Sequence, residues 1–356
     1  MLYFLDFPML QSSFLKKIAA PFKGRPLPHH LHTWLADQLI AGFTPEQLTK
    51  PLLDLGYTEK EILAAAENIL AETSFTSARK IQSVLGRRES LLKTLDLLYQ
   101  HQDGYTEIKK TPLPDFQTFL KEYYYKNKPG HFTGGTEHWA ARKWTPQNLI
   151  AKVGASTLVE IQTGRESDPD YEKNSLKHKQ RVPFGDFVKR IEDTSSSNDF
   201  YLTANNQALG NNLFKNLTND FSNIGDGYLD LTKTEGRQFL WTGPRGIITP
   251  LHHDLTNNIF IQIYGKKRFR LIPATEAPYL YNKTRVFSEV DLLHPDLTKY
   301  PLFKNINVLE IDVLPGDCVF IPVGWWHHVV GESASISLSF TNINTPLPNT
   351  MIDFPK

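Results

Sequence analysis

The sequence predicts a mainly β chain preceded by a helical region, and two observations carry this prediction. From residue 238 onward, short runs rich in β-branched and aromatic residues alternate with turns that contain Gly or Pro. Many short strands separated by such turns are typical of a β-sandwich or barrel. Residues 1–100 instead show apolar residues at helical spacing, together with helix-start signals.

The N-terminal region carries two clear helix starts. Thr44 is followed by Pro45 and Gln47, and Thr58 is followed three residues later by Glu61. A Thr cap with Gln or Glu at the third helical position forms a capping box, and proline is favoured at the first helical position. The region is interpreted either as a small helical bundle packed on the main domain or as a partner-binding or dimerising module.

The middle of the chain mixes loops, helices and strands. Residues 101–140 contain Pro-rich and Gly-containing turns and are expected to form a connector. Residues 164–179 carry many charged side chains and few apolar ones, so we expect an exposed loop, either a plain surface connection or a lid over a binding site. The strands expected along the chain are 158–162, 200–203, 239–242, 258–264, 267–272, 307–313, 318–321 and 335–342.

The composition excludes several classes of protein. The chain has 356 residues, a formal net charge of +1 and a pI of about 7.8, so nothing in it demands a polyanionic partner. Cys318 is the single cysteine, which excludes an intramolecular disulfide and a cysteine-rich zinc site. No apolar run approaches the roughly 20 residues of a membrane span. Residues 1–11 lack the features of a secretory signal, so we expect a cytoplasmic protein.

A pair of polar residues in the C-terminal half is typical of a metal site. His252 and Asp254 are two residues apart, and on a strand such residues point the same way, so the imidazole and the carboxylate converge. Two His and one carboxylate with open positions are expected for non-haem Fe(II) oxygenases. A lone His-x-Asp arises often by chance. The stretch 314–329, which contains His327 and His328, is the one good candidate for a third ligand.

Lys267 is a second candidate site residue. If residues 267–271 form a strand, Lys267 shares a face with Phe269 and Leu271, and the neighbouring basic residues lie on the other face. An ammonium on an apolar face is costly unless it is paired. A bound carboxylate would pair it. The alternative is a lysine at a strand end whose ammonium reaches the surface.

The motifs follow one another in a fixed order between Thr249 and His327. They read Thr-Pro-x-His-x-Asp, Asn, Gly-x-Lys-Arg, Pro-Gly-Asp, Ile-Pro and Trp-Trp-His. This order resembles the Jumonji C (JmjC) and cupin-like 2-oxoglutarate oxygenases over roughly the C-terminal two-thirds of the chain. It is most similar to their protein-hydroxylase branch, which includes the asparaginyl hydroxylase that acts on hypoxia-inducible factor. The resemblance implies a double-stranded β-helix, the cupin jelly roll, with the oxygenase domain at residues 141–356.

The resemblance also implies a complete site. His252, Asp254 and His327 would hold Fe(II), with 2-oxoglutarate and O2 as co-substrates, and Lys267 would bind the distal carboxylate of 2-oxoglutarate. His253, which should face the other way, would pack or support the ligands, and His328 is the alternative to His327 as the distal ligand. Further contacts with 2-oxoglutarate are implied for residues whose side chains form hydrogen bonds, and these are Thr249, Asn258, Tyr201 and Asn342. Three tryptophans are expected either to pack in the core or to line the site, and these are Trp241, Trp325 and Trp326.

The expected substrate is a side chain of a peptide or protein, which would be hydroxylated with succinate and CO2 as co-products. The alternatives are a free amino acid or other small metabolite, and a non-catalytic cupin-like binding protein. No zinc-finger reader is visible, which disfavours a demethylase. No dense basic patch with interleaved aromatics is visible, which disfavours a nucleic-acid partner. A membrane partner is not expected, and a homodimer is left open.

Overall fold

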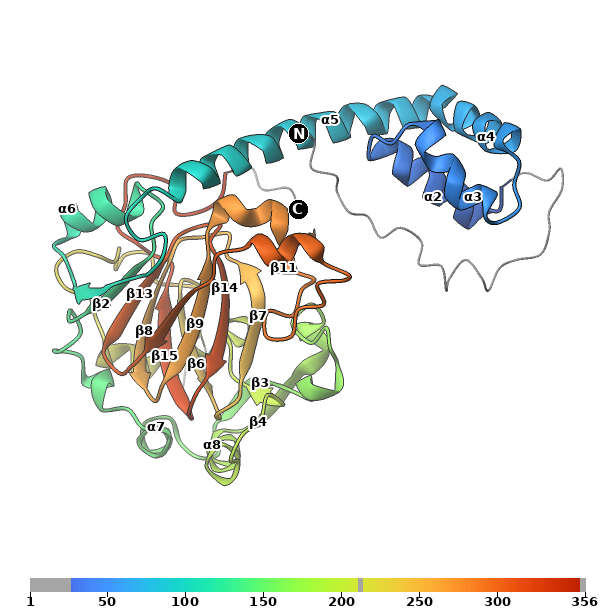
Figure 1. Ribbon diagram of the computed structural model, residues 1–356. Helices are drawn as coiled ribbons and strands as arrows, with labels where there is room; N and C mark the ends of the chain where they lie inside the picture. The colour runs from blue at the N-terminus through green and yellow to red at the C-terminus, as the bar shows by residue number, and fades with distance from the viewer. Residues whose placement is uncertain (1–26, 211–213, 353–356) are drawn as a thin grey trace. The chain divides into compact units, whose positions relative to one another are not determined.

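The computed structural model describes residues 27–210 and 214–352, and the chain splits into two compact units after Leu95. The first unit is helical, with a core supplied by apolar residues such as Leu35, Leu52 and Ile62. Both expected capping boxes are present, at Thr44 and Thr58. The helical character expected of residues 1–26, and the expectation about a secretory signal in residues 1–11, lie outside the described residues. The helices are α2 (His29–Ile40), α3 (Thr49–Leu53), α4 (Glu59–Ala71) and α5 (Thr73–Tyr99), whose last turn belongs to the second unit (Figure 1).

Helix α5 is one continuous helix of 27 residues. Charged residues recur along it, so its length does not make it apolar. None of the helices in the described parts of the chain combines the length and the apolar character that crossing a membrane requires.

The second unit is built on two six-stranded sheets that enclose a core (Figure 1). In spatial order, the first sheet is β1 (Lys110–Pro112), β2 (Gly130–Thr133), β13 (Asp317–Ile321), β8 (Asn258–Tyr264), β15 (Ser335–Phe340) and β6 (Gln238–Gly243). The second is β10 (Asn282–Thr284), β11 (Phe287–Ser288), β7 (Ile248–His253), β14 (Trp326–Gly331), β9 (Lys267–Ile272) and β12 (Leu309–Val313). Both sheets contribute to one apolar cluster, for example through Phe260 and Phe269. The arrangement confirms the predicted jelly roll.

Strand β9 shows the alternation that the sequence predicted. Lys267 and Phe269 are buried, whereas Arg268 and Arg270 are partly exposed and form ion pairs with acidic residues of β12. Gly265 makes the turn from β8 possible, because its φ is +72° and an added Cβ would lie 1.9 Å from the Ala334 carbonyl oxygen. Lys267 therefore points inward because side chains alternate along β9.

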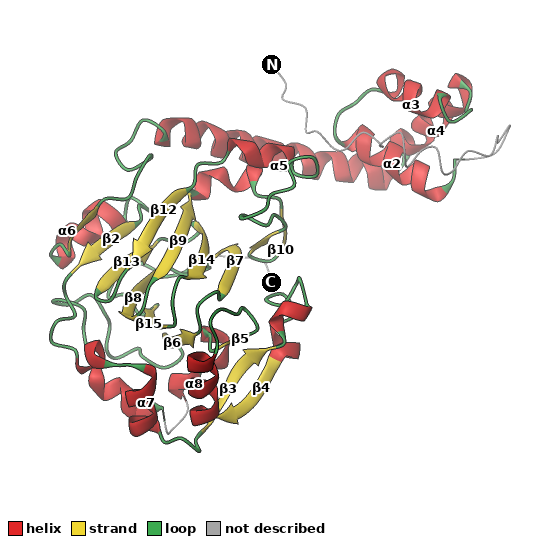
Figure 2. Cartoon of the chain, turned by 60° about the horizontal axis from the view of Figure 1, so that its bottom comes forward, coloured by secondary structure: helices red, strands yellow, loops and turns green. Residues whose placement is uncertain are grey.

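A smaller sheet and its helices lie beside the jelly roll (Figure 2). This sheet has the order β4 (Lys179–Pro183), β3 (Leu158–Thr163) and β5 (Phe200–Tyr201). Helices α7 (Pro146–Val153) and α8 (Phe184–Asp193) contact each other near it, and α6 (Phe116–Phe119) lies earlier in the chain. Helix α7 begins after Thr145, whose side chain accepts a hydrogen bond from the Asn148 amide and caps the helix.

Residues 101–140 do more than connect. They supply β1 and β2 to the first sheet, and β2 pairs antiparallel with β13. Strand β2 has only four residues and begins at Gly130, directly after a proline, so its composition indicated a turn. Only its pairing with β13 makes it a strand.

Asp317 of β13 joins β1 and β2 through buried polar contacts. Its carboxylate accepts hydrogen bonds from Lys110 Nζ (2.8 Å), from the Leu314 amide (2.9 Å) and from His131 Nε2 (3.0 Å). Burial opposes ionisation of Asp317, but these hydrogen bonds outweigh it and hold the pKa of the carboxyl below its usual range.

We expect Asp317→Ala to lower the free energy of unfolding by about 3 kcal/mol at pH 7, because Lys110, His131 and the Leu314 amide would lose their shared acceptor. A lowered pKa stabilises the fold above the unfolded value of about 3.9, so the loss should be constant from pH 8 to pH 5 and shrink as the pH falls below about 4. Urea unfolding of both proteins measures this. Asp170→Ala is the matched control, because its pair with Lys173 is exposed. Equal stability of Asp317→Ala and the native chain would contradict the prediction.

Candidate active site

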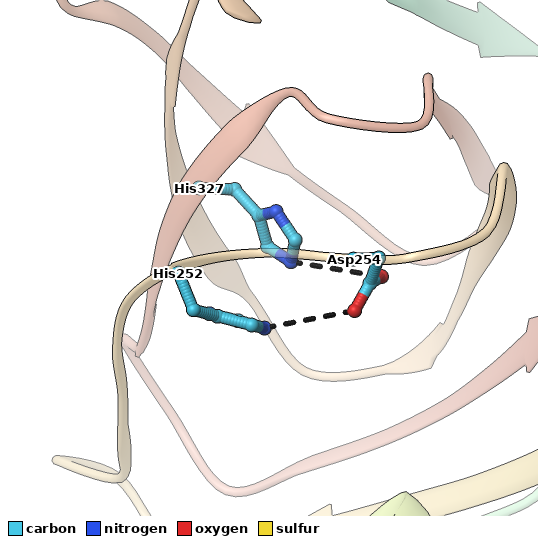
Figure 3. A group of neighbouring side chains, drawn as sticks. All are labelled: His252, Asp254 and His327. Atoms are coloured by element: carbon cyan, nitrogen blue, oxygen red, sulfur yellow. Dashed lines mark ion pairs between the residues drawn. The ribbon is translucent and has the colours of Figure 1, made fainter. Parts of the chain in front are cut away.

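Two histidines and one aspartate converge at the open end of β7 and β14 (Figure 3). His252 lies near the end of β7, Asp254 follows that strand, and His327 lies opposite His252 in the β7–β14 pairing. His252 Nε2 is 3.8 Å from one carboxylate oxygen of Asp254, and His327 Nε2 is 3.9 Å from the other. The three candidate ligand atoms lie within 4.8 Å of one another. This donor set suits a divalent metal such as Fe(II).

Hydrogen bonds orient each member of the cluster. His252 Nδ1 lies 2.8 Å from the Pro250 carbonyl oxygen, and His327 Nδ1 lies 3.3 Å from that of Trp325. A carbonyl accepts from a protonated Nδ1, which leaves each Nε2 with a free lone pair. Burial, and to a smaller extent the charge of the nearby His252, hold the pKa of His327 well below its usual range, so His327 is neutral at pH 7. Neutral imidazole is the form that binds a metal.

The cluster opens into a cavity of about 600 Å³. Lys267 lines this cavity and is 1% exposed. Its Nζ donates to the hydroxyl of Tyr201 at 2.9 Å, and no carboxylate in the described parts of the chain lies within ion-pair distance. Burial lowers the pKa of Lys267 to about 7. A buried amine without a counter-charge, beside a metal-type cluster, fits a small carboxylate ligand.

The other residues expected at the site lie in different places. Thr249, Asn258 and Tyr201 line the cavity. The Asn258 amide donates to Asp254 at 3.2 Å, so Asn258 also orients that carboxylate. Asn342 does not line the cavity, and its amide donates to the Asp230 carbonyl at 2.9 Å. In the structure Asn342 therefore contacts the loop at Asp230 and not the cavity.

Of the three tryptophans, one lines the cavity and two do not. Trp241 lines the cavity and donates to Ser339 Oγ at 2.8 Å. Trp325 and Trp326 belong to apolar clusters and are not among the residues that line the cavity, so they pack the core and do not wall the site. His328 is also buried, and the strand alternation turns it away from His327.

Several cavity residues were not singled out from the sequence. Phe287 of β11 stacks near His252, with ring centroids 5.8 Å apart. Glu172 reaches the cavity from the polar segment 164–179. Others belong to the rim or to β15, and they include Asn205, Glu235, Arg237, Ser339 and Thr341. Period-two alternation in β15 could have indicated Ser339, whereas the loop residues follow no pattern.

Comparison with known proteins gives one family match and several relatives. The model of the cupin-like domain family matches residues 116–342. "Lysine-specific demethylase JMJ30" of Arabidopsis thaliana is 30% identical over 248 residues, which are 65% of this chain and 54% of that protein. "JmjC domain-containing protein D" of Dictyostelium discoideum is 30% identical over 63% of this chain and 54% of its own length. Human "tRNA wybutosine-synthesizing protein 5" is 26% identical over 63% of this chain and 73% of its own.

The chain spans about half the length of the first two relatives. The match covers the two large sheets apart from β1, together with the converging His, Asp and Lys residues, and it leaves out the whole helical unit.

Proposed function

Because this chain belongs to the cupin-like domain family, we propose that it is an Fe(II)- and 2-oxoglutarate-dependent oxygenase that hydroxylates a side chain of a peptide or protein. The family uses Fe(II), 2-oxoglutarate and O2. The observation that carries the proposal is that the His252, Asp254 and His327 cluster shares one cavity with the buried Lys267.

When bound, Fe(II), 2-oxoglutarate and O2 would supply the oxidation: 2-oxoglutarate would lose CO2 and take one oxygen atom of O2 to become succinate, and the other oxygen atom would enter a C–H bond of the substrate. The protein supplies geometry. His252 and His327 present Nε2 to the metal because carbonyls hold their Nδ1 atoms, and Asn258 steadies Asp254. Lys267 supplies the counter-charge for the distal carboxylate of 2-oxoglutarate.

Tyr201 and Thr249 complete the proposed co-substrate subsite. Burial raises the pKa of Tyr201 well above its ordinary value, so its hydroxyl keeps its proton. The hydroxyl can then donate to a carboxylate oxygen of 2-oxoglutarate while it accepts from Lys267. Thr249 offers a second hydroxyl on the cavity wall. Phe260 and Phe269 form the apolar lining around Lys267 and limit the access of water.

Two observations support a macromolecular substrate. A second cavity, of about 610 Å³, shares Glu235 and Gly236 with the first, so a chain that inserts one side chain can continue along the surface. The names of the relatives point to lysine demethylation and to tRNA modification. Hydroxylation as the outcome, and a place in the branch of the asparaginyl hydroxylase, are the finer parts of our proposal.

We assign the activity to residues 141–356, with 101–140 as a connector that also supplies strands. The helical region 1–100 then serves as a structural bundle or as a partner-binding or dimerising module. A cytoplasmic location and a homodimer remain predictions from the sequence.

The substrate class is tested by incubating the purified protein, Fe(II) and 2-oxoglutarate with the host proteome, host RNA or free amino acids. We expect a peptide that gains one oxygen atom, detected by mass spectrometry, only when 2-oxoglutarate is present. The Asp254→Ala protein is the control. Loss of a methyl group from a methylated lysine would replace hydroxylation with demethylation. A modified nucleoside or amino acid, with no protein product, would contradict the peptide substrate.

A further inference from the structure

The residues of segment 164–179 are exposed or half-buried, as the sequence predicted, except that a buried arginine anchors the segment beside the candidate site. Arg165 is 1% exposed. Its Nη2 donates to the carbonyl oxygen of Ile248 at 2.7 Å and to Glu172 Oε1 at 3.0 Å. The hydroxyl of Tyr171 donates to the same carbonyl at 3.1 Å. Two donors therefore hold one peptide group of β7, directly before Thr249.

Arg165 also contacts the residue that holds Lys267. Its guanidinium carbon lies 4.4 Å from the ring centroid of Tyr171 and 5.3 Å from that of Tyr201. Both distances are within the roughly 6 Å range of cation–π attraction. The Tyr201 hydroxyl in turn accepts from Lys267 at 2.9 Å. Tyr201 thus touches two buried cations, one behind the cavity wall and one inside the cavity.

The two cations differ in how their charges are compensated. Arg165 is paired with Glu172, whereas Lys267 has no carboxylate partner in the described parts of the chain. The Nε and Nη1 atoms of Arg165 have no acceptor among the described residues. A buried guanidinium is costly to keep with donors unused, so a hydrophobic residue would suit a purely structural contact better. The planar fork of Arg instead suits a site where a carbonyl, a carboxylate and two rings must be held together.

We propose that Arg165 is a positioning residue for the co-substrate subsite. Held by Ile248 and Glu172, it fixes the ring of Tyr201 and the main chain that carries Thr249. The hydroxyls of Tyr201 and Thr249 and the amine of Lys267 are thereby preformed as a receptor for the distal carboxylate. This inference rests on the proposed function. It adds the segment 164–179 to the site as a fixed wall, where the sequence left a plain loop and a lid open.

The test is anaerobic titration of 2-oxoglutarate into the Mn(II)-loaded full chain. We expect Arg165→Met to raise the Kd for 2-oxoglutarate about tenfold, a loss of about 1.4 kcal/mol, because the receptor is no longer preformed. The Kd for Mn(II) alone should stay within about twofold of the native value, since Arg165 contacts none of the candidate ligands His252, Asp254 and His327. In the aerobic reaction without substrate, KM for 2-oxoglutarate should rise while kcat changes little. Arg165→Lys should recover part of the affinity, because it keeps the charge and loses the planar fork.

Arg190 provides a matched control. It lies 3.9 Å from the ring centroid of Phe200, next to Tyr201, and pairs with Asp199 at 2.8 Å. Its side chain is 44% exposed, and it does not line the cavity. Arg190→Met should leave the Kd for 2-oxoglutarate within about twofold of the native value.

Three outcomes are decisive. A folded Arg165→Met protein with an unchanged Kd for 2-oxoglutarate overturns the inference, and so does a parallel loss of Mn(II) and 2-oxoglutarate binding, which indicates a general structural role. If Arg165→Met does not fold, Arg165→Lys decides: a Kd equal to that of Arg190→Lys overturns the inference. A native chain that binds no 2-oxoglutarate at all overturns the proposed function itself.

Discussion

His252→Ala and Asp254→Ala should each lose bound Fe(II), and with it the conversion of 2-oxoglutarate to succinate. Each change removes one of three donor atoms that lie within 4.8 Å of one another. Loss of a residue that merely orients a metal ligand costs about 10–100-fold in affinity, so loss of a ligand should cost more than about 100-fold. Iron content after gel filtration and succinate formation without substrate measure the two effects. Anaerobic Fe(II) with 2-oxoglutarate should give a weak visible absorption band in the native chain alone.

His253 provides the matched control for His252. The two imidazoles are adjacent in the chain, but His253 faces Trp326, with ring centroids 4.8 Å apart, and lies outside the metal-type cluster. His253→Ala should lower thermal stability, because it leaves a cavity against Trp326, and should keep stoichiometric Fe(II). If His252→Ala retained iron and formed succinate at the native rate, the assignment of the site would be wrong. Equal iron loss in both variants would mean that the cluster responds only to local unfolding.

Lys267→Ala should weaken 2-oxoglutarate binding by 100-fold or more while iron still binds. Removing one partner of a buried charge pair typically costs about 3–5 kcal/mol, and about 1.4 kcal/mol corresponds to one decade in Kd. Calorimetric titration of 2-oxoglutarate into the Mn(II)-loaded protein measures the change. Lys266→Ala is the control, because that side chain pairs with Asp312 on the outer face, at 2.7 Å. It should leave the Kd almost unchanged.

The pH dependence offers a second readout of Lys267. Burial lowers its pKa to about 7 in the unliganded protein, and only the protonated amine attracts a carboxylate. The affinity of the native chain for 2-oxoglutarate should therefore be highest below pH 7 and fall by about tenfold per unit well above it. Lys267→Ala should show no such fall. A flat profile in the native chain, or an unchanged Kd in Lys267→Ala, would move the anchor to another residue.

The sequence by itself determined features that depend on neighbouring residues. The capping boxes at Thr44 and Thr58 specify helix starts, because each needs only a residue three positions away. Strand alternation placed Lys267 on the apolar face of β9. It also predicted that His252 and Asp254 converge, and they do, although Asp254 lies just past the end of β7. The order of the motifs then indicated the jelly roll, whose two sheets the structure contains.

Tertiary structure alone decided what depends on long-range pairing. His327 reaches His252 because β14 pairs with β7, and Asn342 stays outside the cavity although it follows β15, which contributes Ser339 to the lining. The burial of Arg165 could not be predicted from a run of charged residues, because one of its acceptors is the carbonyl oxygen of Ile248, 83 residues away in the sequence. Side-chain periodicity is a local property of a strand. The identity of its neighbours, and hence the partner of each buried charge, is set only when the sheets assemble.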